Sequence, residues 1–192
     1  MKYISTRGND GPLGYEEALL SGLARDGGLY LPTTYPRFSA EEIAAMRGLP
    51  YPELAGLIMA RFTDGEIEAN ELMAMADDAY AGFNDPAVAP LRHLTGDIHV
   101  LELFHGPTIA FKDYAMQFLA RAFDRALQRS SQQAVILGAT SGDTGSAALE
   151  AFQERDAIDV FILFPEGRVS PVQQRQMTSV IAEGANAVAV HG

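Results

Sequence analysis

The segment from residue 134 to residue 190 alternates three apolar stretches with two helical patterns, and this alternation restricts the fold more than any other feature of the sequence. The apolar stretches are 134–138, 158–164 and 186–190, and the helical patterns are 145–154 and Ser170 to about residue 181. Strands and helices that alternate in this way form a parallel sheet with right-handed crossovers and covering helices. We therefore expect an α/β fold with a three-layer βαβαβ unit.

Two helix starts carry capping signals. Ser170 is followed by Pro171, which suits the first helical position, and Gln173 completes a capping box. Ser39 with Glu42 three residues later forms a second capping box, ahead of a short helix. Both patterns predict the residue at which a helix begins.

The first part of the chain mixes short strands with helices. Strands are expected at 2–7 and 29–31, and a helix from Asp113 is expected to follow in the second part. Stripes at helical spacing predict three core-facing helices, carried by Tyr15, Ala18, Leu19 and Leu23, by Leu54, Leu57, Ile58 and Phe62, and by Leu72, Met73, Ala76 and Tyr80. A proline-containing linker precedes residue 92. We therefore expect an α+β domain over 1–92 and a second domain over 93–192.

Lys112 is the first candidate for chemistry. The run from Ile98 to Phe104 is expected to be a strand that delivers the loop at 105–108 and then Lys112. Apolar residues 109–111 precede the lysine, and burial among them would favour the uncharged, nucleophilic amine. The start of a helix at Asp113 adds a dipole that opposes a positive charge. The alternative is an ordinary helix-start lysine whose head reaches water.

A glycine-rich loop, residues 138–145, directly follows the apolar stretch 134–137. Its glycines let the backbone approach a ligand, and the helix that follows offers free N–H groups to an anion. The hydroxyls of Thr140, Ser141 and Thr144 can also donate. Neither the dinucleotide fingerprint nor the P-loop lysine is present. The pattern indicates a site for the acid group of a small substrate, with a purely structural turn as the alternative.

The overall charge and the metal-type residues exclude several classes. With 25 acidic and 14 basic residues, the chain lacks the clustered positive charge that nucleic acid and anionic membranes require. The histidines lack metal-ligand spacing, and the acidic residues Asp64, Glu66 and Glu68 lack calcium-loop spacing, so we interpret the latter as a solvated face. We expect no metal site.

Three features missing from the sequence bear on the cellular compartment in which we expect the protein. The sequence contains no cysteine, no membrane-spanning stretch and no signal peptide at its start. We therefore expect a cytoplasmic protein with a small-molecule substrate.

Taken together, the lysine segment and the glycine-rich loop resemble the threonine synthase family of pyridoxal-phosphate enzymes. The segments that carry the resemblance are 102–113, which is similar to the cofactor-lysine segment of the family, and 139–145, which is similar to its substrate-carboxylate loop. Dehydratases of the same larger group usually carry asparagine at the position of Asp143. Residues 3–8 and 27–32 are similar to the extra N-terminal region of threonine synthases.

The resemblance implies the tryptophan synthase β-like fold, pyridoxal 5'-phosphate as cofactor, and the conversion of O-phospho-L-homoserine and water to L-threonine and phosphate. It also implies a Schiff-base and proton-shuttling role for Lys112. The substrate carboxylate would lie on Thr140, Ser141, Gly142 and Thr144. Asp143 would lie near the 3-oxygen of the cofactor, and His105 would either contact the substrate phosphate or shape its loop.

The sequence leaves two properties open: the class of protein and its oligomeric state. A dehydratase or β-replacement enzyme of the same fold would use the same lysine, and a non-catalytic fragment or paralogue that binds a partner is a different class of protein. A monomer and a homodimer are both compatible with the sequence.

The apolar stretch 186–190 has no helix after it to cover it. We therefore expect the chain to be the N-terminal portion of a longer enzyme and to be inactive alone.

Overall fold

The computed structural model describes residues 1–140, 142–153, 155–180 and 182–191. Two compact units divide the chain, Met1–Asp78 and Ala79–Gly192. The boundary expected near residue 92 falls inside the second unit, and the division into domains 1–92 and 93–192 stays a prediction. Within the described ranges, none of the helices combines the length and the apolar character that a membrane crossing requires.

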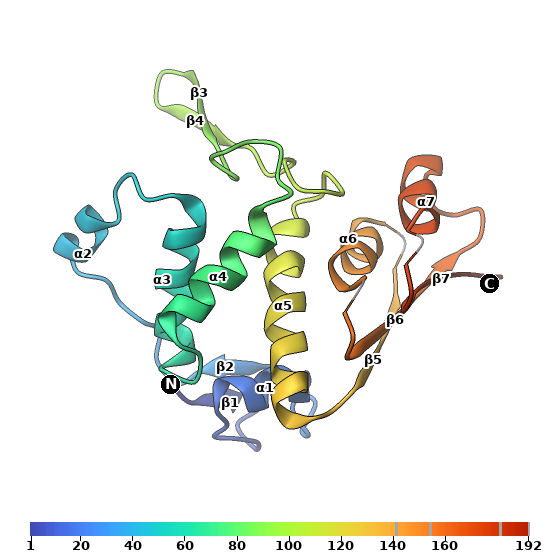
Figure 1. The fold of residues 1–192 in the computed structure, drawn as a ribbon, viewed down its shortest axis with the longest axis horizontal. Coiled ribbons are helices and arrows are strands. Elements are labelled where there is room, and N and C mark those ends of the chain that lie inside the picture. Colours follow the sequence, from blue (N-terminus) through green and yellow to red (C-terminus); the bar gives the residue numbers. More distant parts are fainter. Residues whose placement is uncertain (141, 154, 181, 192) are drawn as a thin grey trace. The chain divides into compact units, whose positions relative to one another are not determined.

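The first unit joins a two-stranded antiparallel sheet to helices (Figure 1). The strands are β1 (Tyr3–Ser5) and β2 (Tyr30–Pro32), and the helices are α1 (Tyr15–Ser21), α2 (Ala40–Ala45), α3 (Tyr51–Thr63) and α4 (Ala69–Tyr80), whose last residues belong to the second unit. Leu72 and Ala76, two residues of the predicted stripe on α4, are fully buried. The capping box at α2 is confirmed: the Ser39 hydroxyl accepts from the Glu42 amide, and the Glu42 carboxylate accepts from the Ser39 amide.

Glu66 caps a helix that lies far away in the sequence. Its two carboxylate oxygens accept hydrogen bonds from the backbone amides of Tyr15 at 2.9 Å and Glu16 at 3.0 Å, the first two residues of α1. The N-cap residue Gly14 supplies no side-chain bond, and a Cβ there would lie 2.6 Å from Glu66 Oε1. A carboxylate at a helix N-terminus satisfies free donors and complements the dipole. The interpretation of Glu66 as part of a solvated face was wrong.

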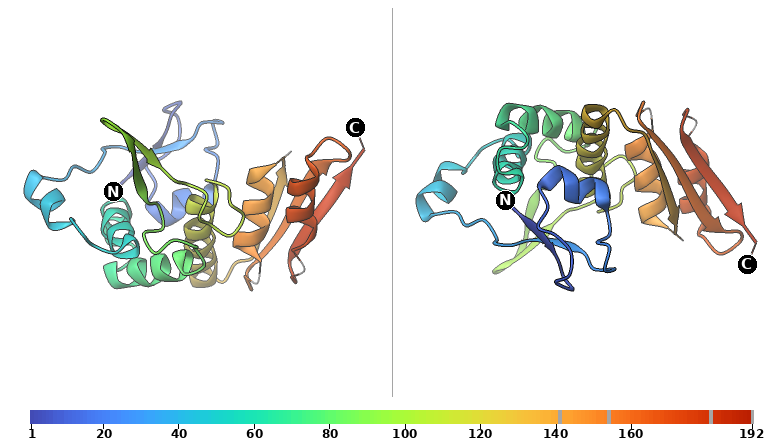
Figure 2. Two further views of the ribbon diagram at one scale, coloured as in Figure 1. Left: turned by 90° about the horizontal axis from the view of Figure 1, so that it is seen from above. Right: turned by 90° about the horizontal axis from the view of Figure 1, so that it is seen from below.

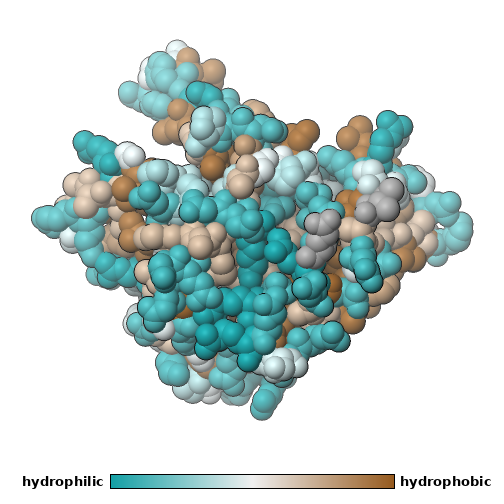
Figure 3. Space-filling view, viewed as in Figure 1, coloured by the Kyte–Doolittle hydropathy of each residue, from teal (hydrophilic) through white to brown (hydrophobic). Residues whose placement is uncertain are grey.

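The second unit opens with an antiparallel hairpin, β3 (Leu91–Thr95) and β4 (Ile98–Leu101). The strand predicted over 98–104 therefore ends three residues early, because β4 pairs only with β3 and β3 begins at Leu91. Every residue of the hairpin is exposed. Leu94 and Ile98 are among its exposed hydrophobic residues, and Figure 3 shows hydrophobic surface at the hairpin.

A three-stranded parallel sheet forms the rest of the second unit, in the order β5 (Ala134–Ala139), β6 (Ile158–Pro165) and β7 (Ala185–Val190). The strands lie side by side in Figures 1 and 2. Three helices accompany them: α5 (Asp113–Ser130), α6 (Asp143–Phe152) and α7 (Pro171–Thr178). The predicted α/β class and βαβαβ order are confirmed.

Helices α6 and α7 pack on the same face of this sheet. A Cβ on Gly145 of α6 would lie 2.9 Å from Ile162 Cγ2 of β6 and 3.0 Å from Met177 Sδ of α7, so the three elements meet at that glycine. Ile162 and Met177 are both buried. On the opposite face of β5, Val135 and Leu137 are 65% and 69% exposed. The described helices therefore leave that face of β5 open.

Candidate active site

The two predicted site segments lie at one end of the parallel sheet. Helix α5 begins, after Lys112 at its N-cap, at the same end at which β5 finishes and the glycine-rich loop follows (Figure 1). Ligands of open parallel sheets bind at the carboxyl ends of the strands. The fold therefore brings both segments to the edge at which binding is expected.

Lys112 is half-buried at the N-cap of α5, as the sequence predicted for a helix-start lysine. Its Nζ lies 5.0 Å from the centroid of the Phe111 ring, within the range of a cation–π contact. Ile109 and Phe111 are 64% and 57% exposed, and Ala110 is the buried residue of the three. The desolvation that we expected from all three apolar neighbours is therefore not seen, because the segment is a turn rather than an inward-packed strand.

A buried carboxylate fixes the lysine loop, which we define as residues 105–112. Asp113 is fully buried, and its Oδ1 and Oδ2 accept from Thr108 Oγ1 at 2.6 Å and from Thr108 N at 2.8 Å. Burial raises the pKa of Asp113, and the hydrogen bonds from Thr108, Ala110 and Ile109 only partly oppose that rise. A Cβ on Gly106 would lie 2.5 Å from Asp113 Oδ2, so the loop needs glycine there.

Ile109 adopts a left-handed backbone conformation, with φ of 65°. This region disfavours β-branched residues and costs ~1–3 kcal/mol. Its amide donates to the Gly106 carbonyl at 3.1 Å, and its neighbour Thr108 is held by Asp113. The strain sits three residues before the candidate nucleophile, where surrounding contacts determine the backbone path.

His105 is held at the start of the lysine loop. Its Nε2 lies 2.9 Å from Glu102 Oε2, and its carbonyl accepts from the Asn84 amide at 2.8 Å. The ring also packs against Phe104, with 4.7 Å between centroids. These contacts support the loop-shaping role, while a contact with substrate phosphate stays a prediction.

The glycine-rich loop connects β5 to the N-terminus of α6. Thr140 donates its amide to the Leu163 carbonyl of β6 at 3.0 Å, and its Oγ1 accepts from the Gly142 amide at 3.3 Å. Gly142 is the N-cap of α6 and makes no side-chain cap. Thr144 is exposed in the first turn, and Ser141 lies outside the described residues. The free N–H groups of such a turn suit an anion.

Asp143, the first residue of α6, is paired with an amide from α7. Gln173 Nε2 donates to Asp143 Oδ1 at 2.8 Å. The Ser170 hydroxyl accepts from the Gln173 amide, as predicted, but it also donates to Gln173 Oε1, so the side chain of Gln173 does not return to the Ser170 backbone. The prediction that Gln173 completes a capping box was wrong, because its Oε1 accepts from the Ser170 hydroxyl rather than from the Ser170 backbone amide.

Gln176, one turn further along α7, contacts the lysine loop. Its Nε2 donates to the Thr108 carbonyl at 2.9 Å. A polar recess of about 230 Å³ lies beside this contact, lined in part by Thr108, Ser146 and Gln176. Helix α7 thus touches both candidate loops.

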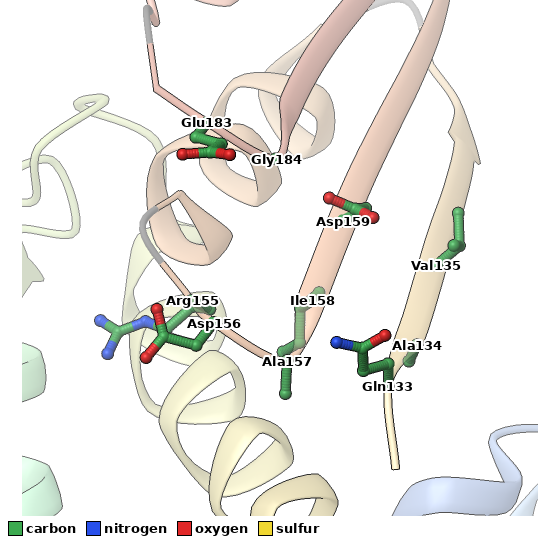
Figure 4. A pocket seen from close by; sticks show the side chains of 10 residues that line it. All are labelled: Gln133, Ala134, Val135, Arg155, Asp156, Ala157, Ile158, Asp159, Glu183 and Gly184. Atoms are coloured by element: carbon green, nitrogen blue, oxygen red, sulfur yellow. The ribbon is translucent and has the colours of Figure 1, made fainter.

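A larger cavity of about 610 Å³ lies away from these residues (Figure 4). Residues just before the strands line it, including Gln133 ahead of β5, Ala157 ahead of β6 and Gly184 ahead of β7. It therefore opens at the amino ends of the parallel strands, opposite the edge at which such folds bind ligands. We assign no function to it.

Sequence reasoning gave no role in the site to four residues of this arrangement: Thr108, Asp113, Gln173 and Gln176. The first two lay within the quoted lysine segment, but no role was assigned to them. Two glutamines spaced i, i+3 on the helix after β6 share a helix face, and this spacing was a usable signal. Among the described residues, no group of three or more His, Asp or Glu side chains could hold a metal ion.

Comparison with known proteins identifies the fold. A family model for the threonine synthase N terminus matches residues 2–80. The chain is 50% identical over 192 residues to the threonine synthase of Pseudomonas aeruginosa and 42% identical over 201 residues to that of Schizosaccharomyces pombe, and both alignments cover 100% of this chain. It covers 41% and 39% of those two proteins. The chain therefore spans about two fifths of the length of these relatives.

Two solved structures superpose closely on the chain. The PLP-bound threonine synthase of Brucella melitensis matches with a TM-score of 0.96 and 56% identity, over 100% of this chain and 41% of that one. The yeast threonine synthase matches with a TM-score of 0.93 and 40% identity, over 100% and 40%. The chain has the fold of the N-terminal region of fold-type II pyridoxal-phosphate enzymes. Within that class, it corresponds to the N-terminal portion of the threonine synthase family.

Proposed function

We propose that this chain is the N-terminal part of a threonine synthase, which converts O-phospho-L-homoserine and water to L-threonine and phosphate with pyridoxal 5'-phosphate as cofactor. One observation carries the proposal. The chain superposes over its whole length on a PLP-bound threonine synthase, while Lys112 stands at the N-cap of α5 at the sheet edge that the glycine-rich loop shares.

The residues present fit this cofactor and substrate. Lys112 supplies a primary amine at a helix start, and the turn into α6 presents backbone donors with no side-chain cap. Gly142 and Gly145 leave no space for a Cβ, which would lie 2.7 Å from Gln173 Nε2 and 2.4 Å from Thr140 Cγ2 respectively. The cofactor, when bound, would withdraw electrons from the α carbon of the substrate.

Each candidate residue then has a defined task. The amine of Lys112 would hold the cofactor and later move protons at the α and β carbons of the substrate. Thr140, Ser141, Gly142 and Thr144 would hold the substrate carboxylate through hydroxyl and backbone donors. His105 would keep the lysine loop in shape through its bond to Glu102.

Asp143 would lie near the 3-oxygen of the cofactor. A carboxylate in that place needs a donor or a positive partner, and the side-chain amide of Gln173 supplies a donor at 2.8 Å.

We keep the cytoplasm as the proposed compartment, supported by a sequence without cysteine. A monomer and a homodimer both remain proposals.

The binding test uses the fact that the chain has two lysines, Lys2 and Lys112. The 192-residue chain is mixed with pyridoxal phosphate, reduced with borohydride and mapped by mass spectrometry. We expect label on Lys112 that Lys112→Ala abolishes and that Lys2→Arg leaves intact. Equal labelling of both lysines would contradict a cofactor site at Lys112.

The reaction is tested in a chimera that joins this chain to the part of the Pseudomonas aeruginosa threonine synthase beyond the matched region. We expect phosphate release from O-phospho-L-homoserine, and a decrease of at least about a hundredfold on Lys112→Ala, because a proton-transferring group is lost. Ammonia release from threonine instead would support the dehydratase alternative. No turnover of either substrate, in a chimera that binds the cofactor, would support the non-catalytic class.

A further inference from the structure

We propose that Gln173 and Gln176 are positioning residues through which α7 couples the lysine loop to the glycine-rich loop. The inference rests on the proposed function only in treating these loops as two parts of one active site. It assigns α7 a role that its capping pattern and sequence position did not suggest.

The two side chains reach different loops from one face of one helix. Residues three apart lie on the same side of an α-helix, so Gln173 and Gln176 point in similar directions. Gln173 donates to the Asp143 carboxylate at 2.8 Å, and Gln176 donates to the Thr108 carbonyl at 2.9 Å. Two hydrogen bonds therefore connect one rigid helix to both site segments.

The helix that carries these glutamines is itself fixed. Its N-terminus is capped by Ser170, whose hydroxyl accepts from the Gln173 amide at 3.2 Å. Met177 is 1% exposed, and its sulfur would lie 3.0 Å from a Cβ on Gly145. A shift of α7 would therefore change the packing at the first turn of α6.

On the lysine side, the contact continues toward Lys112. Thr108, whose carbonyl accepts from Gln176, is bonded through its amide and hydroxyl to Asp113. Asp113 directly follows Lys112 at the start of α5. The path from α7 thus runs by hydrogen bonds from Gln176 to Thr108 and from Thr108 to the buried Asp113 carboxylate, and the peptide bond joins Asp113 to the candidate nucleophile.

On the glycine side, the fit leaves little freedom. A Cβ on Gly142 would lie 2.7 Å from Gln173 Nε2, so the Gln173 amide packs directly against the backbone that would bind an anion. Ordering of either loop should therefore favour the ordered form of the other, because both are bonded to the same helix. This is a coupling between two loops rather than a support for each one separately.

Glutamate substitutions remove the donors while keeping the size of the side chain. Gln173→Glu places a second carboxylate against that of Asp143, and Gln176→Glu places a carboxylate, which has no donor, against the Thr108 carbonyl oxygen. Gln174→Glu adds the same charge to the same helix at an exposed position and is the matched control. Gln173→Ala and Gln176→Ala, which add no charge, serve if a glutamate variant does not fold by circular dichroism.

Hydrogen exchange of the 192-residue chain measures the coupling without any cofactor. Loss of the neutral hydrogen bond from Gln176 to the Thr108 carbonyl should speed exchange of the amides at the lysine loop by roughly two- to tenfold. Loss of the bond from Gln173 to the Asp143 carboxylate should speed exchange at the glycine-rich loop by more, because a bond to a charged group contributes more. The distinguishing result is the effect on the other loop: we expect Gln176→Glu to speed exchange at Gly142 and Gly145, and Gln173→Glu to speed it at Thr108 and Ile109. Effects confined to the nearest loop, or reproduced by Gln174→Glu, would overturn the proposal.

A second readout separates this inference from the proposed function. In the same variants, borohydride-trapped labelling of Lys112 by pyridoxal phosphate is followed in time. If both glutamate variants speed hydrogen exchange at the other loop but the unmodified chain shows no selective label on Lys112, the proposed function fails and the coupling stands. If the unmodified chain is labelled at Lys112 and exchange shows no cross-effect, the coupling fails and the proposed function stands.

Discussion

Replacement of Asp113 by asparagine tests whether the buried carboxylate organises the lysine loop. Asp113 is fully buried and accepts two hydrogen bonds, one from the hydroxyl and one from the amide of Thr108. In Asp113→Asn, one of these donors faces an NH₂ group and loses its acceptor. A buried donor left without an acceptor costs about 1–3 kcal/mol, so we expect a loss of that order in the free energy of unfolding near pH 4.

The pH dependence of this loss gives a second, independent check. Burial raises the pKa of Asp113 in the folded state above its ordinary value of 3.8. A group with a raised folded pKa contributes stability that is fully present below its unfolded pKa and is lost as the pH rises through its folded pKa. The difference in stability between the unmodified chain and Asp113→Asn should therefore be largest near pH 4 and should shrink toward neutral pH.

The assay is urea unfolding, followed by circular dichroism, between pH 4 and pH 8. Asp97→Asn, an exposed residue in the turn of the β3–β4 hairpin, is the matched control and should change the unfolding free energy by less than about 0.5 kcal/mol at every pH. The reasoning fails if the stability difference for Asp113 grows as the pH rises, because the carboxylate would then be stabilised as an ion by its hydrogen bonds rather than penalised by burial.

Three further outcomes are expected. Glu66→Ala should destabilise the first unit by about 1 kcal/mol in urea unfolding, because it frees the amides of Tyr15 and Glu16, and an unchanged midpoint would contradict its role as a helix cap. Gly145→Ala should cost about 1–3 kcal/mol, because its Cβ would lie 2.4 Å from Thr140 Cγ2, whereas Gly82→Ala, which meets nothing within 4 Å, should cost far less; equal effects would refute the packing argument. Thr108→Val should speed hydrogen exchange at Ile109, since it removes the 2.6 Å bond to Asp113, and unchanged exchange would mean that this bond does not hold the loop.

Elements with strong local patterns were predictable. The order of α5, β5, α6, β6, α7 and β7 followed from apolar stretches alternating with helical periodicity, and Lys112 was expected at the helix start where it lies. The hairpin strand β3 was missed because Leu91–Thr95 is exposed throughout and contains Arg92 and His93, so it shows no burial alternation. A strand without a buried face leaves little trace in the sequence.

Contacts between distant residues were not predictable from local patterns. Glu66 caps α1 from 51 residues away, and nothing in the acidic cluster distinguishes it from its neighbours until the chain is folded. Gln173 fitted a local capping box, but its Oε1 accepts from the Ser170 hydroxyl instead of the Ser170 amide, and its Nε2 donates to Asp143, 30 residues away. In both cases the side chain makes a tertiary contact that the local sequence pattern does not contain.

The backbone at Ile109 explains why sequence could identify the candidate chemical groups but not their arrangement. Local preference opposes a φ of 65° in a β-branched residue, so the turn before Lys112 must be imposed by its surroundings. Those surroundings are the bonds of Thr108 to Asp113 and to Gln176, which come from α5 and α7. The lysine and the glycine-rich loop are local features, whereas their mutual orientation depends on a buried aspartate and on a helix whose Gln176 lies 68 residues after Thr108. Substitutions at Asp113 and Gln176 should therefore affect the lysine loop more than most changes within the loop itself.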